Sequence, residues 1–465
     1  MYKRRRKVHF VGIGGVGMSG IAEVLLRLGY RVSGSDLRET ETTRRLASLG
    51  ARVVYGHHEN NVETDVEVVV ISSAVRFSNP EVMRARALNI PVIPRAEMLA
   101  ELMRTKSGIA VAGTHGKTTT TSLIAAILAG AGLDPTVVIG GKVLALGANA
   151  RLGNGELMVA EADESDGSFL LLSPVLAVVT NIDPEHLDYY GDLDRVKAAY
   201  LDFINRVPFF GAAVVCLDDP NLRALLPQAK KRTITYGTCP EAEYRATEVW
   251  VRGLHTHFVV ERHGQALGDL VVRMPGRHQA LNALAALAVA TELEVPFETV
   301  RKALAEFNGI HRRFEICGEE RGVLLVTDYG HHPTEIRATL AAAREGFGRR
   351  LVVVFQPHRF TRTRDLFQDF LGAFDSADEL FLTEIYPAGE QPIEGITGEA
   401  LYRALRRRGH LDVEFVPDLS ELPGAVAAHV RPGDLVLLLG AGNIHELVEP
   451  LRERLGNIGS PLSVH

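Results

Sequence analysis

The chain has 465 residues, 46% hydrophobic and 23% charged, with a formal net charge of −6. This length corresponds to about three domains, and the composition excludes disordered, collagen-like and disulfide-scaffold proteins. The acidic balance gives nucleic acid no general electrostatic attraction, and no run reaches the ~18 apolar residues of a membrane span. The three cysteines are widely spaced, which is typical of a reducing compartment. We therefore expect a cytoplasmic protein that binds no nucleic acid and does not insert into membranes.

Short β-branched runs alternate with longer amphipathic stretches, a pattern typical of βα units around parallel sheets. The pattern predicts an α/β protein of three domains, 1–107, 108–314 and 315–465. The first and last are expected to be Rossmann-like, and the central one is expected to be a phosphate-loop ATPase-like parallel sheet. Residues 243–273 alternate in polarity and predict a small antiparallel appendage. Strands are expected over 7–11, 30–34, 52–55, 67–71, 91–93, 108–112, 157–160, 176–180, 212–217, 323–327, 351–355, 379–383, 412–416 and 435–439, and helices over 96–103 and 278–292.

A glycine-rich turn follows the first expected strand. Gly12-Ile13-Gly14-Gly15-Val16-Gly17 matches G-x-G-x-x-G, in which glycines let a diphosphate approach the N–H groups at a helix N-terminus. Asp36 ends the second strand, where a ribose-binding acid belongs in a dinucleotide site. The motif by itself does not separate NAD(P) from another nucleotide diphosphate, or either from a turn that only packs helix on strand.

A phosphate loop opens the central domain. The strand over 109–112 runs into Gly113-Thr114-His115-Gly116-Lys117-Thr118-Thr119, and a helix is expected to follow. In such a loop, backbone N–H groups and the Lys117 ammonium bind phosphates, and the Thr118 hydroxyl can reach Mg²⁺. The loop is shorter than the usual motif, because Val111 stands where the first glycine would be. The sequence predicts ATP binding here.

Two acidic clusters follow later strands of the same domain. The first is Glu161-Ala162-Asp163-Glu164-Ser165-Asp166, and the second is Asn181-Ile182-Asp183-Pro184-Glu185-His186-Leu187-Asp188. Ligands of open parallel sheets bind beyond the carboxyl ends of strands, so both clusters should face the phosphate loop. Carboxylates are ligands that Mg²⁺ prefers, which predicts a magnesium site at this edge.

These motifs resemble those of the Mur ligases, ATP-dependent amide-forming enzymes of peptidoglycan precursor synthesis. The resemblance runs from residue 7 to residue 447 and includes segments of the last domain: 328–333, 356–359, 361–365 and 386–390. Together with the opening segment 12–22, it implies a ligase that joins L-alanine to the carboxylate of UDP-N-acetylmuramate, with ATP and Mg²⁺ as cofactors. The first domain is then expected to hold the UDP part rather than NAD.

The resemblance also implies roles for individual residues. The residues expected to act in catalysis are Lys117, Arg313 and His358. The expected ATP-binding residues are Gly113, Thr114, His115, Gly116, Lys117, Thr118, Thr119, His278, Asn282, Arg313 and Asp328. The residues expected to bind the sugar nucleotide or the amino acid are Gly14, Gly15, Val16, Gly17, Asp36, Ser72, Tyr329, His358, Arg359 and Arg362. The expected metal ligands are Thr118, Glu161 and His186.

Other interpretations stay open at this point. A ligase that attaches a whole recycled peptide to the same sugar nucleotide is the nearest, although segment 12–22 argues against it. An NAD(P)-dependent oxidoreductase fused to a nucleotide-binding regulator would explain the glycine turn but leaves the acidic clusters without a role. His331-His332 could be a packing pair at a strand end, and Arg359, Arg362 and Arg364 a solvated helix start. A homo-oligomer is possible and cannot be read from the sequence.

Overall fold

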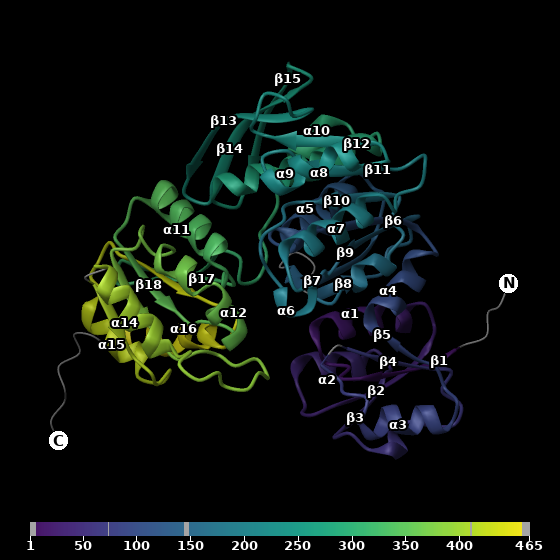
Figure 1. The fold of residues 1–465 in the computed structure, drawn as a ribbon. Helices are drawn as coiled ribbons and strands as arrows, with labels where there is room; N and C mark the ends of the chain where they lie inside the picture. Colours follow the sequence, from purple (N-terminus) through teal and green to yellow (C-terminus); the bar gives the residue numbers. More distant parts are fainter. Residues whose placement is uncertain (1–5, 73, 144–147, 410–411, 458–465) are drawn as a thin grey trace. The chain divides into compact units, whose positions relative to one another are not determined.

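A computed structural model describes the chain except for residues 1–5, 73, 144–147, 410–411 and 458–465. The fold is mixed α/β, and the described strands form three sheets (Figure 1), which confirms the predicted fold class. The chain divides into two compact units. The first unit comprises Met1–Thr247, Val259–Leu270 and Leu281–Asn308, and the second comprises Glu248–Phe258, Val271–Ala280 and Gly309–His465.

The first sheet is parallel and has the strand order β3-β2-β1-β4-β5. Its five strands lie where the β-branched runs predict them, within about two residues. They are β1 (Lys7–Val11), β2 (Arg31–Asp36), β3 (Arg52–Tyr55), β4 (Val68–Ile71) and β5 (Val92–Pro94). The helices of this region are α1 (Val16–Arg27), α2 (Glu41–Ser48), α3 (Pro80–Ala87) and α4 (Arg95–Met103). The glycine turn connects β1 to α1 at the carboxyl edge of this sheet.

The second sheet has ten strands in the order β15-β14-β13-β12-β11-β10-β6-β9-β7-β8. Strand β6 (Ser107–Ala112) lies between β10 (Leu176–Val179) and β9 (Leu157–Glu161) and is parallel to both. The phosphate loop follows β6 and leads into α5 (Lys117–Gly130). The other strands of this part are β7 (Thr136–Val143), β8 (Ala148–Arg151), β11 (Ala212–Cys216) and β12 (Thr233–Gly237). The helices are α6 (Leu187–Tyr190), α7 (Leu193–Ile204), α8 (Pro220–Leu225), α9 (Arg277–Glu292) and α10 (Phe297–Ala305).

The predicted antiparallel appendage is present as an extension of this sheet. It consists of β13 (Tyr244–Arg252), β14 (His255–Arg262) and β15 (Gln265–Val272). Two-residue turns join these neighbouring strands, so the chain reverses direction at each turn. Strand β13 pairs in parallel with β12, which makes the appendage continuous with the central sheet.

The third sheet belongs to the second unit and has the order β16-β17-β21-β18-β19-β20. Its strands are β16 (Glu315–Glu320), β17 (Val323–Asp328), β18 (Leu351–Phe355), β19 (Glu379–Leu382), β20 (Val413–Phe415) and β21 (Leu435–Leu439). The helices are α11 (Pro333–Phe347), α12 (Phe360–Asp365), α13 (Phe367–Leu371), α14 (Gly398–Arg408), α15 (Leu422–His429) and α16 (Val448–Asn457). Every residue of β17, β18 and β21 is buried, because apolar side chains pack on both faces of the sheet. This explains why β18 and β21 are continuous apolar runs.

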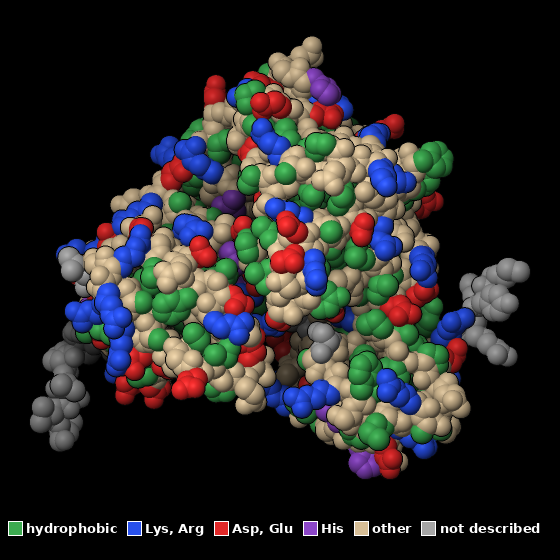
Figure 2. Space-filling view, in the orientation of Figure 1, with side chains coloured by type: hydrophobic (Ala, Val, Ile, Leu, Met, Phe, Trp, Pro, Cys, Tyr) green, Lys and Arg blue, Asp and Glu red, His purple; other side chains and the backbone are tan. Residues whose placement is uncertain are grey.

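The surface carries charges of both signs. Figure 2 shows Lys and Arg side chains interspersed with Asp and Glu over the face that it draws. Among the residues that the structure describes, no helix combines the length and the apolar character needed to cross a membrane.

Candidate active site

Two glycines fix the conformation of the phosphate loop. Gly113 has a φ of +132°, and a Cβ built on it would lie 2.0 Å from Oγ1 of Thr180. Gly116 has a φ of +80°, and its Cβ would lie 2.6 Å from Oδ1 of Asn282. L-residues rarely adopt positive φ, and here the neighbouring atoms also leave no room for a side chain. The loop therefore requires glycine at both positions.

The strand order brings both acidic clusters to the loop. Strands β9 and β10 flank β6 and run parallel to it, so their carboxyl ends share one edge. From the first cluster, Glu161 accepts a hydrogen bond from the Thr118 hydroxyl at 2.9 Å. From the second, Asp183 lies with its Oδ2 2.9 Å from Nε2 of His115. The clusters thus contact the loop directly, as the strand pattern predicts.

Lys117 is held at the loop by three acceptors. Its ammonium donates to the carbonyl oxygens of Gly113 at 2.6 Å and Thr114 at 3.1 Å, and to Oε1 of Glu164 at 2.8 Å. Burial opposes the charge of Lys117, but the Glu164 and Glu161 carboxylates outweigh it and raise the lysine's pKa. Burial raises the pKa of Glu164 to about 7, against the lowering effect of Lys117. Lys117 therefore keeps its positive charge at the loop, and this charge attracts an anionic phosphate.

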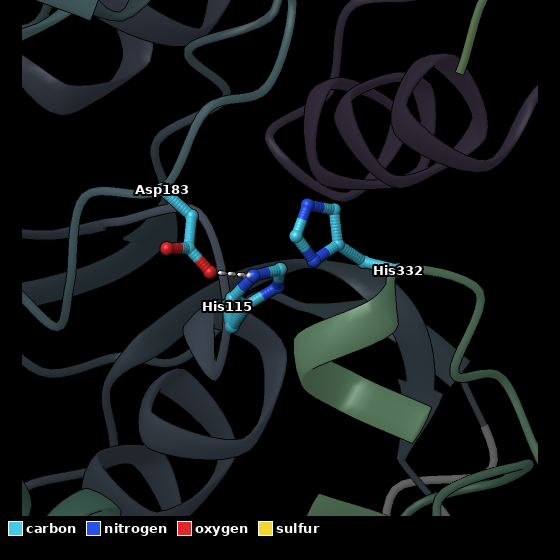
Figure 3. Close-up of side chains that lie close together, drawn as sticks. All are labelled: His115, Asp183 and His332. Atoms are coloured by element: carbon cyan, nitrogen blue, oxygen red, sulfur yellow. Dashed lines mark hydrogen bonds and ion pairs between the residues drawn. The ribbon is translucent and has the colours of Figure 1, made fainter. Parts of the chain in front are cut away.

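Residues of the second acidic cluster form hydrogen bonds with the phosphate loop at Thr114 and His115. Figure 3 shows the His115 ring directed at the Asp183 carboxylate. The Asn181 side chain accepts a hydrogen bond from the backbone N–H of His115 at 2.8 Å and donates to its carbonyl at 3.0 Å. The Thr114 hydroxyl accepts a hydrogen bond from the backbone N–H of Asp183 at 2.9 Å. Through these contacts His115 and Thr114 hold the loop to the segment that follows β10, and Thr119 is buried within α5.

Two of the three residues expected to bind magnesium, Thr118 and Glu161, lie next to each other. Thr118 and Glu161 are adjacent through their hydrogen bond, and Glu161 also accepts from the N–H of Gly140 at 2.5 Å. A hydroxyl and a carboxylate are hard oxygen donors, which fit Mg²⁺. His186 lies at the start of α6 with a left-handed φ of +56°. Its ring nitrogen is a softer donor and the less typical member of a magnesium set.

Asn282 and His278, both on α9, have different surroundings. Asn282 is buried beside the loop, and its Oδ1 accepts a hydrogen bond from the Thr120 hydroxyl at 3.2 Å. His278 lies with its Nε2 2.9 Å from Nε2 of Gln279. A Cβ on Gly276, which has a φ of +121°, would lie 2.4 Å from the His278 ring. Their expected roles at adenine stay predictions.

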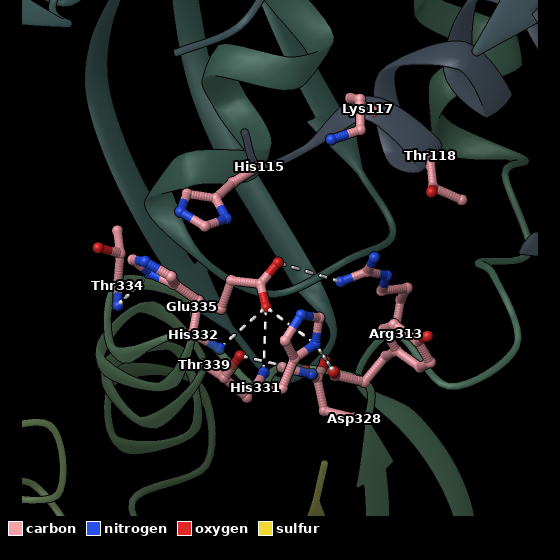
Figure 4. A network of polar contacts seen from close by, with 12 residues as sticks. His115, Lys117, Thr118, Arg313, Asp328, His331, His332, Thr334, Glu335 and Thr339 are labelled. Carbon is pink, nitrogen blue, oxygen red and sulfur yellow. Dashed lines mark hydrogen bonds and ion pairs between the residues drawn. The ribbon is translucent and has the colours of Figure 1, made fainter. Parts of the chain in front are cut away.

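In the second unit, the residues around Tyr329 form a compact cationic group. The guanidinium carbons of Arg312 and Arg313 lie 4.9 Å and 5.2 Å from the centre of the Tyr329 ring. Arg313 also lies with its Nη1 3.7 Å from Oε1 of Glu335. Figure 4 shows Glu335 at the centre of this network, where its carboxylate accepts a hydrogen bond from the backbone N–H of His331 at 3.0 Å.

Asp328 stabilises the first segments of the third sheet through hydrogen bonds to the backbone. Its carboxylate accepts hydrogen bonds from the backbone N–H groups of Phe314 and Gly330, both at 2.7 Å, and burial raises its pKa. These contacts connect the end of β17 to the segment that precedes β16. His332 caps α11 by accepting a hydrogen bond from the N–H of Thr334 at 3.2 Å. His332 therefore stabilises the start of α11 through its ring nitrogen.

His358, Arg359 and Arg362 lie at the carboxyl end of β18. The His358 ring stacks on Tyr386 with centroids 5.5 Å apart and planes at 8°. Arg362 is buried, and its Nη1 lies 3.2 Å from Nδ1 of His358 and donates to the His358 carbonyl at 3.1 Å. Arg359 has a φ of +72°, a strained conformation for a side-chain-bearing residue, while its N–H donates to the Tyr386 carbonyl at 2.9 Å.

The glycine turn of the first sheet is closed by Asp36. The Asp36 carboxylate accepts a hydrogen bond from the N–H of Gly14 at 2.8 Å. Gly15 caps α1, and the side chain of Val16 lies outside the described residues. Ser72 follows the carboxyl end of β4. All of them lie at the edge where nucleotides bind in such sheets.

Sequence reasoning missed Arg95, the first residue of α4. A Cβ on Gly17 would lie 2.9 Å from its guanidinium, which also donates to Oδ2 of Asp163 at 2.8 Å. Arg95 therefore connects the glycine turn with the first acidic cluster. The only signal in the sequence is an arginine at a helix start after Pro94, which is too common to single out.

Comparisons with known proteins cover nearly the whole chain. The family models described as "Mur ligase family, catalytic domain", "Mur ligase middle domain" and "Mur ligase, glutamate ligase domain" match residues 7–107, 111–290 and 312–442. A UDP-N-acetylmuramate–L-alanine ligase of Geotalea daltonii is 58% identical over 457 residues, which is 97% of this chain and 100% of the relative. One from Myxococcus xanthus is 58% identical over 458 residues and 97% of each chain.

Solved structures agree. The UDP-N-acetylmuramate-alanine ligase of Thermotoga maritima has a TM-score of 0.82 and 33% identity over 96% of this chain and 98% of its own. A murein peptide ligase of Psychrobacter arcticus has a TM-score of 0.72 at 24% identity over 98% and 100%, and this likeness shows the fold alone. With three matching family domains in the family's order, the chain belongs to the Mur ligase family.

Proposed function

We propose that this protein joins L-alanine to UDP-N-acetylmuramate at the expense of ATP, the activity named for its 58% identical relatives. The observation that carries the proposal is the similarity over 97% of the chain, combined with a phosphate loop whose Lys117 is charged and faces an acidic edge. Peptidoglycan precursor synthesis from two nucleotide substrates also supports a cytoplasmic location.

The reaction needs an activated carboxylate, since oxide is too poor a leaving group for direct amide formation. ATP transfers its γ-phosphoryl group to the carboxylate of UDP-N-acetylmuramate, which gives an acyl phosphate and ADP. The amine of L-alanine attacks the acyl carbon, loses a proton, and displaces phosphate. The products are UDP-N-acetylmuramoyl-L-alanine, ADP and phosphate.

The protein contributes positioning and charge neutralisation to the phosphoryl step. Backbone N–H groups of loop 113–116 and the Lys117 ammonium bind the phosphates of ATP. Asn282 borders the loop, where the adenosine is expected, with His278 on the same helix. Arg313 adds a guanidinium for the developing charge.

Thr118 and Glu161 would hold Mg²⁺, and His186 would complete the protein's share of the ligands. When bound, the ion would neutralise charge on the phosphate oxygens. The hydrogen bond between Thr118 and Glu161 supports this assignment, because it places two oxygen donors next to each other beside Lys117.

The remaining residues are proposed to bind the other two substrates. The first sheet binds the UDP part through Gly14, Gly15, Gly17, Asp36 and Ser72. The last domain handles the amino-acid end through Tyr329, His358, Arg359 and Arg362, with His358 as the candidate acceptor of the amine proton.

Release of phosphate on mixing protein, ATP and UDP-N-acetylmuramate with each candidate amine tests the proposal. We expect release with L-alanine and little with the tripeptide L-alanyl-γ-D-glutamyl-diaminopimelate. Preference for the tripeptide would favour the recycling ligase, and turnover of NADH without phosphate release would favour the oxidoreductase.

A further inference from the structure

The ammonium of Lys117 has three N–H donors, and three acceptors of the protein occupy them. Two of these acceptors are carbonyl oxygens of the phosphate loop itself, on Gly113 and Thr114. The third is Oε1 of Glu164, which lies outside the loop in the first acidic cluster. A phosphate that engages Lys117 must therefore take over a donor that one of these groups holds.

Glu164 is the exchangeable acceptor of the three. The two carbonyls belong to the turn that Gly113 and Gly116 lock, so they cannot move without remodelling the loop. Glu164 is only 3% exposed, and within the described part of the chain its second oxygen, Oε2, has no hydrogen-bond partner. Burying half a carboxylate in this way costs stability, which argues for a role other than packing.

The backbone of Glu164 is anchored while its carboxylate is not. The Tyr190 hydroxyl donates to the Glu164 carbonyl oxygen at 2.6 Å, and the N–H of Gly167 donates to the same oxygen at 3.0 Å. Rotation of the side chain can therefore release Lys117 without disturbing the chain around it. Two anions beside one ammonium repel each other, so a bound phosphate and an ionised Glu164 oppose each other's contact.

We propose that Glu164 is a positioning residue of the phosphate loop, whose carboxylate competes with a nucleotide phosphate for the third donor of Lys117. This inference rests on the ATP binding proposed above and adds to it a residue with an opposing effect. Glu164 keeps the lysine aligned over the loop, and it weakens the loop's affinity for phosphates. This competition favours the release of ADP, because the Glu164 carboxylate can replace ADP as the hydrogen-bond partner of the Lys117 ammonium.

The test measures ADP binding to wild type, Glu164→Gln and Asp166→Asn by calorimetry without divalent metal. The Gln oxygen still accepts from Lys117 but carries no charge, so we expect Glu164→Gln to bind ADP about three- to tenfold more tightly. Asp166→Asn removes a charge from the same cluster, and its oxygen can still accept from the N–H of Ser168. We expect this control to change ADP affinity less than twofold.

A packing role for Glu164 predicts the opposite result, since damage to the loop weakens binding. Equal or weaker ADP binding by Glu164→Gln, with an unchanged melting temperature, would overturn the inference. If Glu164→Gln does not fold, Glu164→Asp replaces it, because the shorter side chain keeps the charge and withdraws from Lys117. Tighter ADP binding by Glu164→Asp than by wild type supports the inference, and unchanged ADP binding overturns it. Wild-type protein that binds no ADP would overturn the proposed function itself.

Discussion

Gly116 and Asn282 approach each other so closely that any side chain on Gly116 would collide with the amide oxygen of Asn282, only 2.6 Å from an added Cβ. Gly116 caps α5 in the left-handed conformation, and Asn282 on α9 accepts a hydrogen bond from Thr120 one turn further along α5. The shape of the phosphate loop therefore depends on a helix more than 150 residues away in sequence.

Replacing Gly116 by alanine should abolish nucleotide binding. Backbone strain at positive φ costs about 1–2 kcal/mol, and the collision displaces either the loop or Asn282. Gly132→Ala is the matched control, because Gly132 has a similar φ of +76° but nothing within 4 Å of its added Cβ. We expect Gly132→Ala to be less stable yet to bind ADP normally. Equal ADP affinities for both variants would show that Asn282 does not restrict the loop.

Lys117→Ala should lose orders of magnitude in turnover while it remains folded, because the ammonium stabilises the phosphoryl transition state. The measurement is phosphate release at saturating substrates, with circular dichroism to verify folding. Lys302→Ala, an exposed lysine on α10, serves as the control and should behave like wild type. Activity of Lys117→Ala within about tenfold of wild type, which corresponds to ~1.4 kcal/mol, would contradict the phosphate-loop assignment.

The proposed metal ligands make a prediction about Mg²⁺ dependence. Glu161→Ala and His186→Ala should each raise the Mg²⁺ concentration needed for half-maximal rate, because each removes one ligand. Glu156→Ala, at an exposed position just before β9, should leave it unchanged. If both ligand variants keep the wild-type dependence, the two acidic clusters stabilise the loop and do not bind the metal.

Glu81 predicts a pH-dependent contribution to stability in the first sheet's domain. Its buried carboxylate accepts hydrogen bonds from Ser35 at 2.8 Å and Asn61 at 2.9 Å and lies 2.8 Å from His9. Burial would raise the pKa of Glu81, but these partners outweigh it and lower it. The stabilisation is therefore present above the ordinary carboxyl pKa near 4.5 and is lost as the pH falls through the lower pKa of the folded protein.

Glu81→Gln should thus reduce the free energy of unfolding by about 2–3 kcal/mol at pH 7, and the difference from wild type should shrink below pH 4. Urea unfolding across this pH range measures the effect. Glu39→Gln, at an exposed position, is the control and should match wild type at every pH. A difference for Glu81→Gln that stays constant with pH would mean that packing, not charge, accounts for it.

The sequence predicts the central strands well, because buried parallel strands such as β18 and β21 are unbroken apolar runs. It does not predict β7, β8, β12 or β16, whose sequences mix glycine or polar residues with fewer apolar ones. Strand β16, for example, reads Glu-Ile-Cys-Gly-Glu-Glu at the edge of its sheet and contains a register shift near Gly318. None of the residues of β16 is buried, so its apolar pattern is weak.

The same limit applies to the site. Local motifs locate the loop and both acidic clusters, because each follows a recognisable strand. They do not reveal contacts that only the folded chain creates, such as Arg95 with Gly17 or Lys117 with Glu164. The motif also does not reveal that the Asp36 carboxylate accepts a hydrogen bond from the N–H of Gly14. The residues in these contacts are far apart in the sequence, and their side-chain types alone do not specify which of them come together.

Arg359 distinguishes the two halves of the proposed reaction. Its strained backbone and its N–H bond to the Tyr386 carbonyl fix where its side chain starts, and its Nε lies 4.0 Å from Oε1 of Glu390. If the guanidinium binds the α-carboxylate of L-alanine with two parallel hydrogen bonds, lysine cannot reproduce that geometry. Arg359→Lys should then raise the KM for L-alanine by the equivalent of a few kcal/mol and leave the KM for ATP nearly unchanged.

In the proposed reaction acyl-phosphate formation precedes the attack of the alanine amine, so this step should survive in Arg359→Lys. Hydroxylamine trapping of the acyl phosphate without L-alanine measures this step separately from overall turnover. Arg403→Lys is the control, since Arg403 is exposed on α14 and pairs only with Glu399 among the contacts described. If the sugar-nucleotide KM rises instead, alanine dependence stays flat and trapping falls with turnover, then Arg359 binds the diphosphate of UDP-N-acetylmuramate. That result would move Arg359 to the donor side of the reaction, because a residue that binds only alanine cannot affect a step measured without alanine.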